Sequence, residues 1–367
     1  MSASHYLRPI ALCDSPQSEE GEAVRLAGGL VYASRFALIA RDGGKVISRD
    51  RYSVPELSAA LGSLSDAVRQ QWDNVQRSHA PLQCGARTIR LDQPQIMGIL
   101  NVTPDSFSDG GQFMDDPVVA SAHASAMLEA GAAIVDVGGE STRPGAAAVW
   151  EGDELKRVIP AVERLASAGA AISVDTRRLA VMEAALAAGA HIINDVSALR
   201  HDPRSLEFAA KSGVPVVLMH APGEREDLHG DAGYDDVVLD VFDWLADRRD
   251  TALAAGIARD RILLDPGIGF GKSVADNLAL MNALPLFHAL GQPLLVGASR
   301  KRMIGALSNE APAHKRLGGS LTLALKALDA GVQVVRVHDV ADTVQTQRVW
   351  RGLRDAALTD FGQLPPL

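Results

Sequence analysis

The sequence has little cysteine and no long apolar run. Its two cysteines, Cys13 and Cys84, are too few for a disulfide framework. No uninterrupted apolar stretch is long enough to span a bilayer, and Met1–Arg8 lacks the apolar run of a signal peptide. These absences predict a cytoplasmic protein without a membrane segment.

Positive charge is also scarce. The 36 Lys and Arg residues are outnumbered by 45 Asp and Glu residues, so the formal net charge at pH 7 is −9. A broad nucleic-acid footprint or a basic membrane-binding face needs the opposite balance. We therefore expect neither nucleic acid nor a membrane among the partners of this protein.

The rest of the composition is that of a globular chain. Of the 367 residues, 47% are hydrophobic and 22% are charged, which argues against disorder and low-complexity structure. At this length we expect one large domain of roughly 250 residues and a smaller one.

One structural unit recurs from about residue 120 onward. A helix rich in Ala and Leu ends in a Gly, and a β-branched run then stops at a polar residue. Gly suits the left-handed conformation that ends a helix, and short apolar runs suit strands that are buried on both faces. The helix-ending glycines are Gly131, Gly169, Gly189, Gly213, Gly256, Gly291 and Gly331.

These units supply seven strands, and Ile96–Leu100 supplies an earlier one. Eight strands that alternate with helices predict an α/β chain folded as a (β/α)8 TIM barrel. An open doubly wound sheet permits the same alternation and stays the alternative. Nearly every strand ends in a polar or ionisable residue, and a barrel gathers such ends around one mouth.

The sequence predicts that residues 1–92 form a separate N-terminal α+β extension and that residues 93–367 form the barrel. Phe36–Ser48 has the pattern of a hairpin with a glycine turn. Ser53–Glu56 has the spacing of a capping box, which predicts a helix that runs irregularly to about Ser78. No motif in the extension specifies chemistry, so we expect a structural or assembly role.

Two long polar loops follow the first two strands. The first begins at Asn101 and contains Asp109, and the second contains Arg143. Long loops at a barrel mouth usually carry function. The carbonyl oxygen of Asn101 could bind a metal or a phosphate-bound ion. Arg143 could reach an anionic substrate group, pair with Asp109, or form a surface ion pair only.

Asp175, Asn194 and Asp265 end the third, fourth and sixth predicted strands. A carboxylate at the end of a buried strand is costly unless it is paired. Two acids and an amide suit a ligand rich in N–H donors, such as a 2-amino-4-oxo heterocycle. Metal binding and helix capping are the alternatives for these residues.

A cationic group follows the last two strands. Arg336 and His338 are two residues apart on the eighth strand and therefore point to the same side. Ser299 and Lys301 follow the seventh strand. Arg, Lys and His beside a helix N-terminus favour a phosphate site, and the loops after strands seven and eight are where barrels commonly bind phosphate.

Seven motifs occur in order along the chain: NVTPDSFSDGG, DVGGESTRPG, SVDT, IIND, LDPGIGFGK, GASRK and RVHDV. With these motifs the sequence resembles the dihydropteroate synthases of folate biosynthesis, over roughly residues 94–350. The resemblance implies a transferase that joins 6-hydroxymethyl-7,8-dihydropterin diphosphate to p-aminobenzoate and releases pyrophosphate. It also implies small-molecule substrates and a homodimer.

The resemblance further implies roles for individual residues. Asn101 would hold Mg²⁺ and the pyrophosphate. The catalytic group would be Lys301, Arg336, His338, Asp109 and Arg143. The pterin diphosphate would contact Thr142, Asp175, Asn194, Met219, Asp265, Lys301, Arg336 and His338. The p-aminobenzoate pocket would comprise Phe107, Thr142, Pro144, Phe270 and Ser299.

Three other functions compete with this one. A pterin-dependent methyltransferase would share the barrel and the pterin residues. A barrel aldolase would use Lys301 to form a Schiff base. A non-catalytic protein would bind pterin and form no product.

The sequence also departs from the family at Ala221–Gly223, where the family commonly has another Met and a Gly-rich step. The rim of the pterin pocket at these residues therefore stays undetermined.

Overall fold

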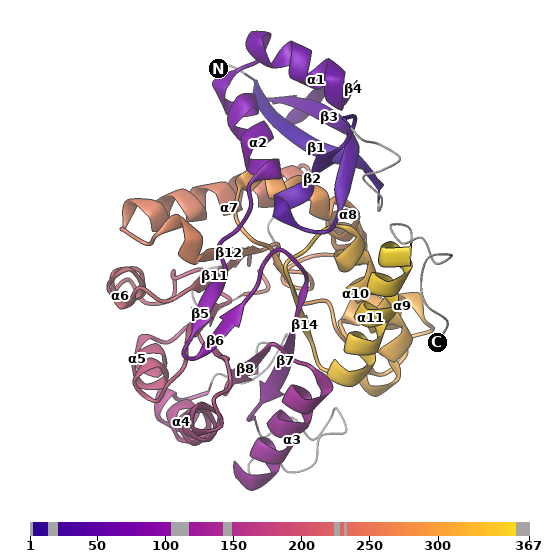
Figure 1. Ribbon diagram of the computed structural model, residues 1–367. Helices are drawn as coiled ribbons and strands as arrows, with labels where there is room; N and C mark the ends of the chain where they lie inside the picture. Colours follow the sequence, from indigo (N-terminus) through magenta and orange to yellow (C-terminus); the bar gives the residue numbers. More distant parts are fainter. Residues whose placement is uncertain are drawn as a thin grey trace.

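The computed structural model describes residues 3–13, 21–103, 117–141, 149–223, 228–230 and 233–356. Eight parallel strands form one sheet in the order β12-β11-β10-β9-β8-β7-β14-β13. A parallel bridge between Leu264 and Leu294 joins its two ends. The sheet is therefore the predicted barrel and not an open doubly wound sheet (Figure 1).

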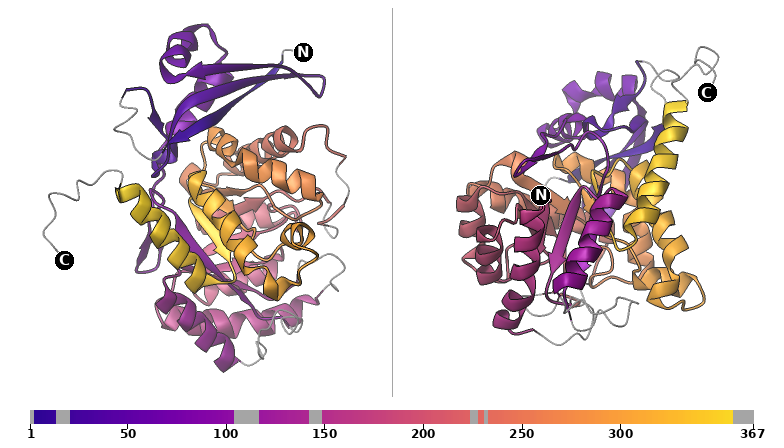
Figure 2. Two further views of the ribbon diagram at one scale, coloured as in Figure 1. Left: turned by 90° about the vertical axis from the view of Figure 1, so that its right-hand side faces the viewer. Right: turned by 60° about the horizontal axis from the view of Figure 1, so that its bottom comes forward.

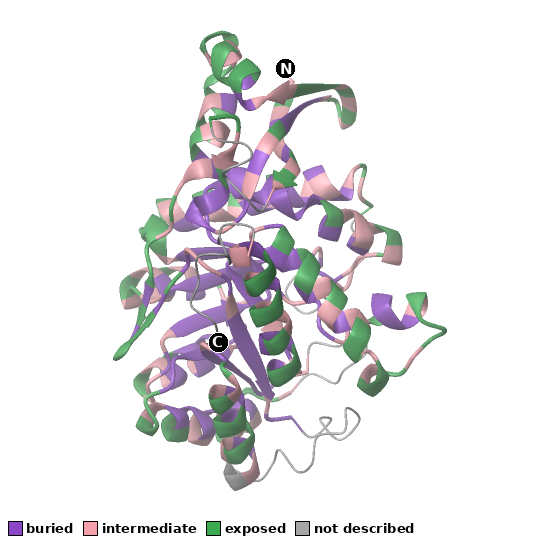
Figure 3. Ribbon diagram, turned by 45° about the vertical axis from the view of Figure 1, so that its right-hand side comes forward, coloured by how far each residue is buried: buried purple, intermediate pink, exposed green. Residues whose placement is uncertain are grey.

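The barrel strands lie where the apolar runs predicted them. Their bounds are β7 Gln95–Asn101, β8 Ile134–Gly138, β9 Ile172–Asp175, β10 Ile192–Asp195, β11 Val216–Met219, β12 Ile262–Asp265, β13 Leu295–Val296 and β14 Val334–Val337. Figure 3 shows these strands buried inside a ring of helices whose outer faces are exposed.

A helix follows each barrel strand, and a short one, α9, precedes α10. Their bounds are α3 Pro117–Ala130, α4 Glu151–Ser167, α5 Leu179–Ala187, α6 Ser205–Ser212, α7 Val237–Ala254, α8 Val274–Ala283, α9 Arg302–Leu307, α10 Leu317–Asp329 and α11 Val340–Ala356. All seven predicted helix-ending glycines have positive φ, from 68° at Gly213 to 111° at Gly131, as the left-handed conformation requires. None of the helices in the described ranges is both long and apolar enough to cross a membrane.

A short hairpin closes the amino end of the barrel. Strands β5 (Leu82–Cys84) and β6 (Arg87–Ile89) pair antiparallel. Their inward side chains share one buried cluster with residues near the starts of the barrel strands, among them Met97 and Val217. This hairpin lies inside the segment that the sequence assigned to the extension, although by packing it belongs with the barrel.

The N-terminal extension forms an antiparallel sheet with two helices. The predicted hairpin is present as β3 (Tyr32–Asp42) and β4 (Lys45–Ser53). The predicted capping box starts α1 (Val54–Ala60), but this helix is short. A 3-10 turn and a new N-cap at Ser65 then begin α2 (Asp66–Gln76), which is why the helical pattern is irregular.

Two strands of the extension were not predicted. β2 (Val24–Arg25) is very short. β1 (Ser4–Cys13) contains Pro9, a residue that argues against a strand, and its pairing with β3 shifts register between Pro9 and Ala11. The strand therefore accommodates the proline at a bulge.

The extension packs against α7, α8 and the 3-10 helix Leu284–Leu290, as Figures 1 and 2 show. Its buried side chains and those of α7 and α8 form a single hydrophobic cluster. The Tyr6 hydroxyl donates to Asp243 at 2.7 Å, and Asn74 Nδ2 donates to the carbonyl of Ala289 at 2.9 Å. The extension and the barrel thus share one core.

Candidate active site

Arg336 lies at the centre of the polar group inside the barrel. It projects from β14, and its Nε donates to Asp136 Oδ2 at 2.6 Å, while its Nη2 donates to Asp175 Oδ2 at 2.6 Å. Asn194 Nδ2 donates to the same Asp136 oxygen at 3.0 Å. Side chains from four strands, β8, β9, β10 and β14, therefore meet at one place.

Asn101 belongs to the same group. Gly138 lies between it and Asp175: a Cβ at Gly138 would be 3.4 Å from Asp175 Cβ and 3.7 Å from Asn101 Oδ1. The strand ends of β7, β8 and β9 therefore place the Asn101 amide oxygen and the Asp175 carboxylate around the same glycine.

Helix capping does not explain the three strand-ending residues. The N-caps of α5, α6 and α8 are Arg178, Arg204 and Ser273. Asp265 instead accepts a hydrogen bond of 2.7 Å from the backbone N–H of Gly267 in the following turn. The structure thus brings Asp175 and Asn194 together as predicted and removes the capping alternative.

The carboxyl groups of this region are electrostatically perturbed. Burial raises the pKa of Asp265 to about 6, although the Gly267 N–H and the charges of Lys301, Arg336 and Lys272 favour its ionised form. Burial also raises the pKa of Asp175, against the opposing charge of Arg336. Acids with raised pKa values in a barrel mouth are typical of functional sites.

If the site binds the pterin that the sequence resemblance implies, the raised pKa of Asp265 predicts that this binding depends on pH. An ionised carboxylate only accepts hydrogen bonds, so a ligand rich in N–H donors binds the ionised form. Affinity should therefore rise from about pH 5 to about pH 7, as Asp265 loses its proton near pH 6. Calorimetric titration with a pterin in two buffers checks this: binding at pH 5.5 should release protons, and Asp265→Asn should remove most of that release. An affinity that is constant over the range would contradict the prediction.

Lys301 and Phe270 form one wall of the site. The Lys301 ammonium lies 4.3 Å from the centroid of the Phe270 ring, and His229 stacks on that ring with centroids 5.2 Å apart. Met219 shares a small buried cluster with Phe270 and Ala221. The structure therefore brings Lys301, Phe270 and Met219 together, and their roles stay predictions.

Lys272 clamps the loop that carries Phe270, and the sequence did not single it out. Its ammonium donates to the carbonyls of Gly267 at 2.9 Å and Phe270 at 3.0 Å. It also lies 2.9 Å from Nδ1 of His220. Burial lowers the pKa of Lys272 to about 7 and that of His220 to about 2, so the imidazole is neutral and accepts a hydrogen bond.

Ser299 and His338 are in direct contact. Ser299 Oγ lies 3.0 Å from His338 Nδ1 and accepts the backbone N–H of His338 at 3.2 Å. Next to them, Arg300 is ion-paired with Asp339. The loops after β13 and β14 are thereby joined beside Arg336.

The rim at Ala221–Gly223, which departs from the family pattern, is held by an arginine. Arg200 Nη2 donates to the carbonyls of Ala221 at 2.9 Å and Gly223 at 3.0 Å. The Arg200 guanidinium also lies 5.1 Å from the Trp244 ring centroid. The backbone of the rim is therefore held by the Arg200 side chain, which is itself packed against Trp244.

Five predicted site residues lie outside the described residues, and their roles stay predictions: Phe107, Asp109, Thr142, Arg143 and Pro144. The chain just before the second loop is nevertheless well braced. Glu140 accepts from Arg178 Nη2 at 2.8 Å and from Arg177 Nε at 3.1 Å. Burial alone would raise the pKa of Glu140, but these arginines outweigh it and lower the pKa.

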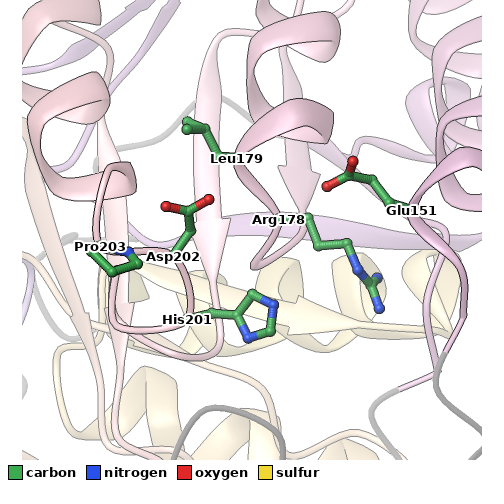
Figure 4. A pocket seen from close by; sticks show the side chains of 6 residues that line it. All are labelled: Glu151, Arg178, Leu179, His201, Asp202 and Pro203. Atoms are coloured by element: carbon green, nitrogen blue, oxygen red, sulfur yellow. The ribbon is translucent and has the colours of Figure 1, made fainter.

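A polar hollow of about 240 Å³ lies beside this brace (Figure 4). It lies at the starts of α4 and α5 and in the loop before α6, and no predicted site residue among the described residues lines it. The lining residues are Glu151, Arg178, Leu179, His201, Asp202 and Pro203.

The strand ends of the barrel gather carboxylates, an amide and cations around one mouth, which is where the active sites of barrel enzymes lie. The family model described as "Pterin binding enzyme" matches residues 97–338. The Escherichia coli K12 dihydropteroate synthase is 48% identical over 263 residues, which cover 71% of this chain and 92% of that protein. The Bacillus subtilis dihydropteroate synthase is 47% identical over 268 residues, 73% and 90% of the two chains.

Solved structures agree. The Xanthomonas albilineans dihydropteroate synthase with 4-aminobenzoic acid is 47% identical with a TM-score of 0.70, covering 78% of this chain and all of that one. The Burkholderia cenocepacia dihydropteroate synthase complexed with 7,8-dihydropteroate is 42% identical with a TM-score of 0.69, covering 76% and 98%. The chain therefore belongs to the dihydropteroate synthase family, which confirms the resemblance and favours it over the methyltransferase, aldolase and non-catalytic alternatives.

Proposed function

We propose that the chain condenses 6-hydroxymethyl-7,8-dihydropterin diphosphate with p-aminobenzoate, giving 7,8-dihydropteroate and pyrophosphate. The observation that carries the proposal is the bonded group of Asp136, Asp175, Asn194 and Arg336. It offers oxygen acceptors to a heterocycle rich in N–H donors and a guanidinium to an anion. The presence of 4-aminobenzoic acid in the structure of the Xanthomonas albilineans relative supports the second substrate.

In this mechanism the pterin contacts Asp175, Asn194 and Asp265, with Lys301 and Met219 beside it. Arg336 uses Nε and Nη2 on carboxylates, and we assign Nη1, with His338, to the diphosphate. Cations placed in advance stabilise the charge that develops on the departing pyrophosphate. The arylamine is already a fair nucleophile, so we assign no general base. The site needs only to position the amine against the pterin methylene.

We assign the p-aminobenzoate to the side of the site formed by Phe270 and Ser299. Phe270 is buried and held by the Lys272 clamp, and Ser299 bonds to His338. Phe107, Thr142 and Pro144 would complete this pocket, and Asp109 and Arg143 would close over it. Closure excludes water from a pterin cation if the diphosphate bond breaks early.

We infer that Mg²⁺ is the cofactor and that Asn101 holds it. Mg²⁺ usually takes one or two protein oxygens together with phosphate oxygens and water. The donor set fits, because the amide oxygen of Asn101 and the side chain of Asp175 both lie next to Gly138 at the ends of their strands. Bound there, the ion would neutralise charge on the diphosphate.

A turnover assay with both substrates and Mg²⁺ tests the proposed function. Dihydropteroate and pyrophosphate should form in equal amounts, and both should depend on p-aminobenzoate. A chelator should stop the reaction, and added Mg²⁺ should restore it. Pyrophosphate alone would mean that the second substrate is wrong. Neither product from folded, pterin-binding protein would favour the methyltransferase or the non-catalytic alternative.

We also propose a homodimer formed through α10 and α11. Val349 and Leu353 lie one turn apart on α11 and are 60% and 71% exposed, and Leu325 is exposed on α10. Exposed apolar side chains gathered on neighbouring helices favour association. Leu353→Lys should raise the dimer dissociation constant at least about tenfold, because it buries an unpaired charge.

Light scattering after size exclusion measures this change, with Ile47→Lys on β4 as a matched control. Ile47 is 61% exposed but lies in the extension, far along the chain from α11, so its replacement should leave the dissociation constant unchanged. A monomeric wild-type protein, or equal effects of the two variants, would refute the proposed interface.

We infer a cytoplasmic location from cysteine usage. The chain has only two cysteines, and Cys84 is free and buried in the cluster beneath the β5–β6 hairpin, as expected in a reducing compartment. Cell fractionation tests the inference, and recovery outside the cytoplasm would overturn it.

A further inference from the structure

Asp136 is a buried carboxylate that touches two residues of the site at once. It lies on β8 with its side chain fully buried. Its Oδ2 accepts from Asn194 Nδ2 at 3.0 Å and from Arg336 Nε at 2.6 Å. Its Oδ1 is buried without a partner among the described residues. The residue itself is therefore inaccessible to substrate but controls two groups that we assign to substrate.

The first consequence concerns the amide of Asn194. An ionised carboxylate only accepts hydrogen bonds, so Asn194 must turn its NH2 toward Asp136. The Asn194 carbonyl oxygen is then the atom left for a ligand. Asn194 also pairs with Asp175 across β9 and β10, so the two side chains next to each other both present acceptors.

The second consequence concerns the guanidinium of Arg336. Asp136 holds Nε and Asp175 holds Nη2, so two fixed contacts define the plane of the group. The buried negative charge of Asp136 also balances the positive charge of Arg336. The carbonyl oxygen of Asn194 is not needed for that contact. Orientation of the amide and orientation of the guanidinium thus depend on one oxygen atom.

We propose that Asp136 is a positioning residue that determines pterin specificity. By fixing the Asn194 amide as an acceptor, it makes the site select a 2-amino-4-oxopteridine over a 2,4-dioxopteridine, which lacks the 2-amino donor and carries an acceptor there instead. This inference rests on the proposed function. A site built to bond a ligand N–H rejects an analogue without it, because buried polar groups are then left unpaired.

The test compares the binding of the two pteridines by calorimetry. In Asp136→Ala the Asn194 amide can rotate and offer a donor, so the ratio of the two affinities should fall at least about tenfold. In Asp136→Asn an oxygen can still accept from both Asn194 and Arg336, so the ratio should stay within about threefold of wild type. If the Ala variant does not fold, Asp136→Ser carries the same expectation.

Asp195→Asn is the matched control. Asp195 is the next residue after Asn194 and is as fully buried as Asp136, but among the described residues its side chain bonds to the turn at Ser197 and Leu199. This variant should lose thermal stability while keeping the affinity ratio. Equal loss of affinity for both pteridines in Asp136→Ala, or an unchanged ratio, would overturn the specificity role. A wild-type protein that binds neither pteridine would instead refute the proposed function.

Discussion

Arg336→Ala is expected to cost about 3–5 kcal/mol of unfolding free energy and to reduce turnover at least about 100-fold. The stability loss follows because the variant leaves Asp136 and Asp175 as buried carboxylates without their cation. Turnover falls because the cation assigned to the departing diphosphate is gone. Urea unfolding and kcat/KM for the diphosphate substrate measure the two effects.

The pH dependence of the Arg336→Ala loss identifies its cause. Unpaired buried carboxyls take up protons more readily, so the cost should be smaller at pH 5 than at pH 8. Adding Asp136→Asn to the variant should restore part of the stability, since only one carboxylate stays unpaired, but should not restore turnover. A cost that is the same at both pH values would contradict the pairing argument.

A surface ion pair provides the matched control for Arg336→Ala. Lys211 and Glu207 on α6 make an N–O contact of 2.5 Å, but their side chains are 74% and 68% exposed. Solvent screening makes such a pair worth little. Lys211→Ala should therefore change the unfolding free energy by less than about 1 kcal/mol and leave turnover unaltered.

The sequence predicted the barrel correctly because its signals are local. Each strand is a short apolar run, and the seven predicted helix-ending glycines, such as Gly213 and Gly331, all have positive φ. The extension was predicted less well for an equally local reason. Pro9 obscured β1, and the three-residue strands β5 and β6 are too short to show a periodicity.

The site was predicted in part, because its partners are distant in sequence. Asp136 and Arg336 are 200 positions apart, and Lys272 and His220 are 52 apart. Only the closed barrel brings these side chains together, so no local pattern in the sequence reveals these particular contacts. Asp136 lies within a motif that was recognised, and only its contact with Arg336 and Asn194 shows what it does.

Gly267→Ala is expected to lower stability and turnover far more than Gly213→Ala, although φ is +68° at both positions. A non-glycine residue pays a similar backbone cost of about 1–2 kcal/mol at either one. At Gly213, which ends α6, an added Cβ meets nothing within 4 Å, whereas at Gly267 it would overlap the carbonyl oxygen of His220. The whole difference between the variants therefore comes from the crowded loop after β12.

That loop cannot give way without disturbing the site. Gly267 donates its N–H to Asp265 and its carbonyl accepts from Lys272, so a shift of the backbone moves a pterin contact and the Phe270 wall together. We expect Gly213→Ala to keep wild-type kcat/KM, and Gly267→Ala to lose at least about 100-fold for both substrates. Gly269→Ala should fall between them, because the atoms nearest to its added Cβ belong to the flexible Lys301 side chain, at 2.9 Å and beyond. Equal unfolding free energies and equal kcat/KM for the variants at 213 and 267 would show that the loop adapts, and would remove the steric argument for its role in holding Asp265 and Phe270.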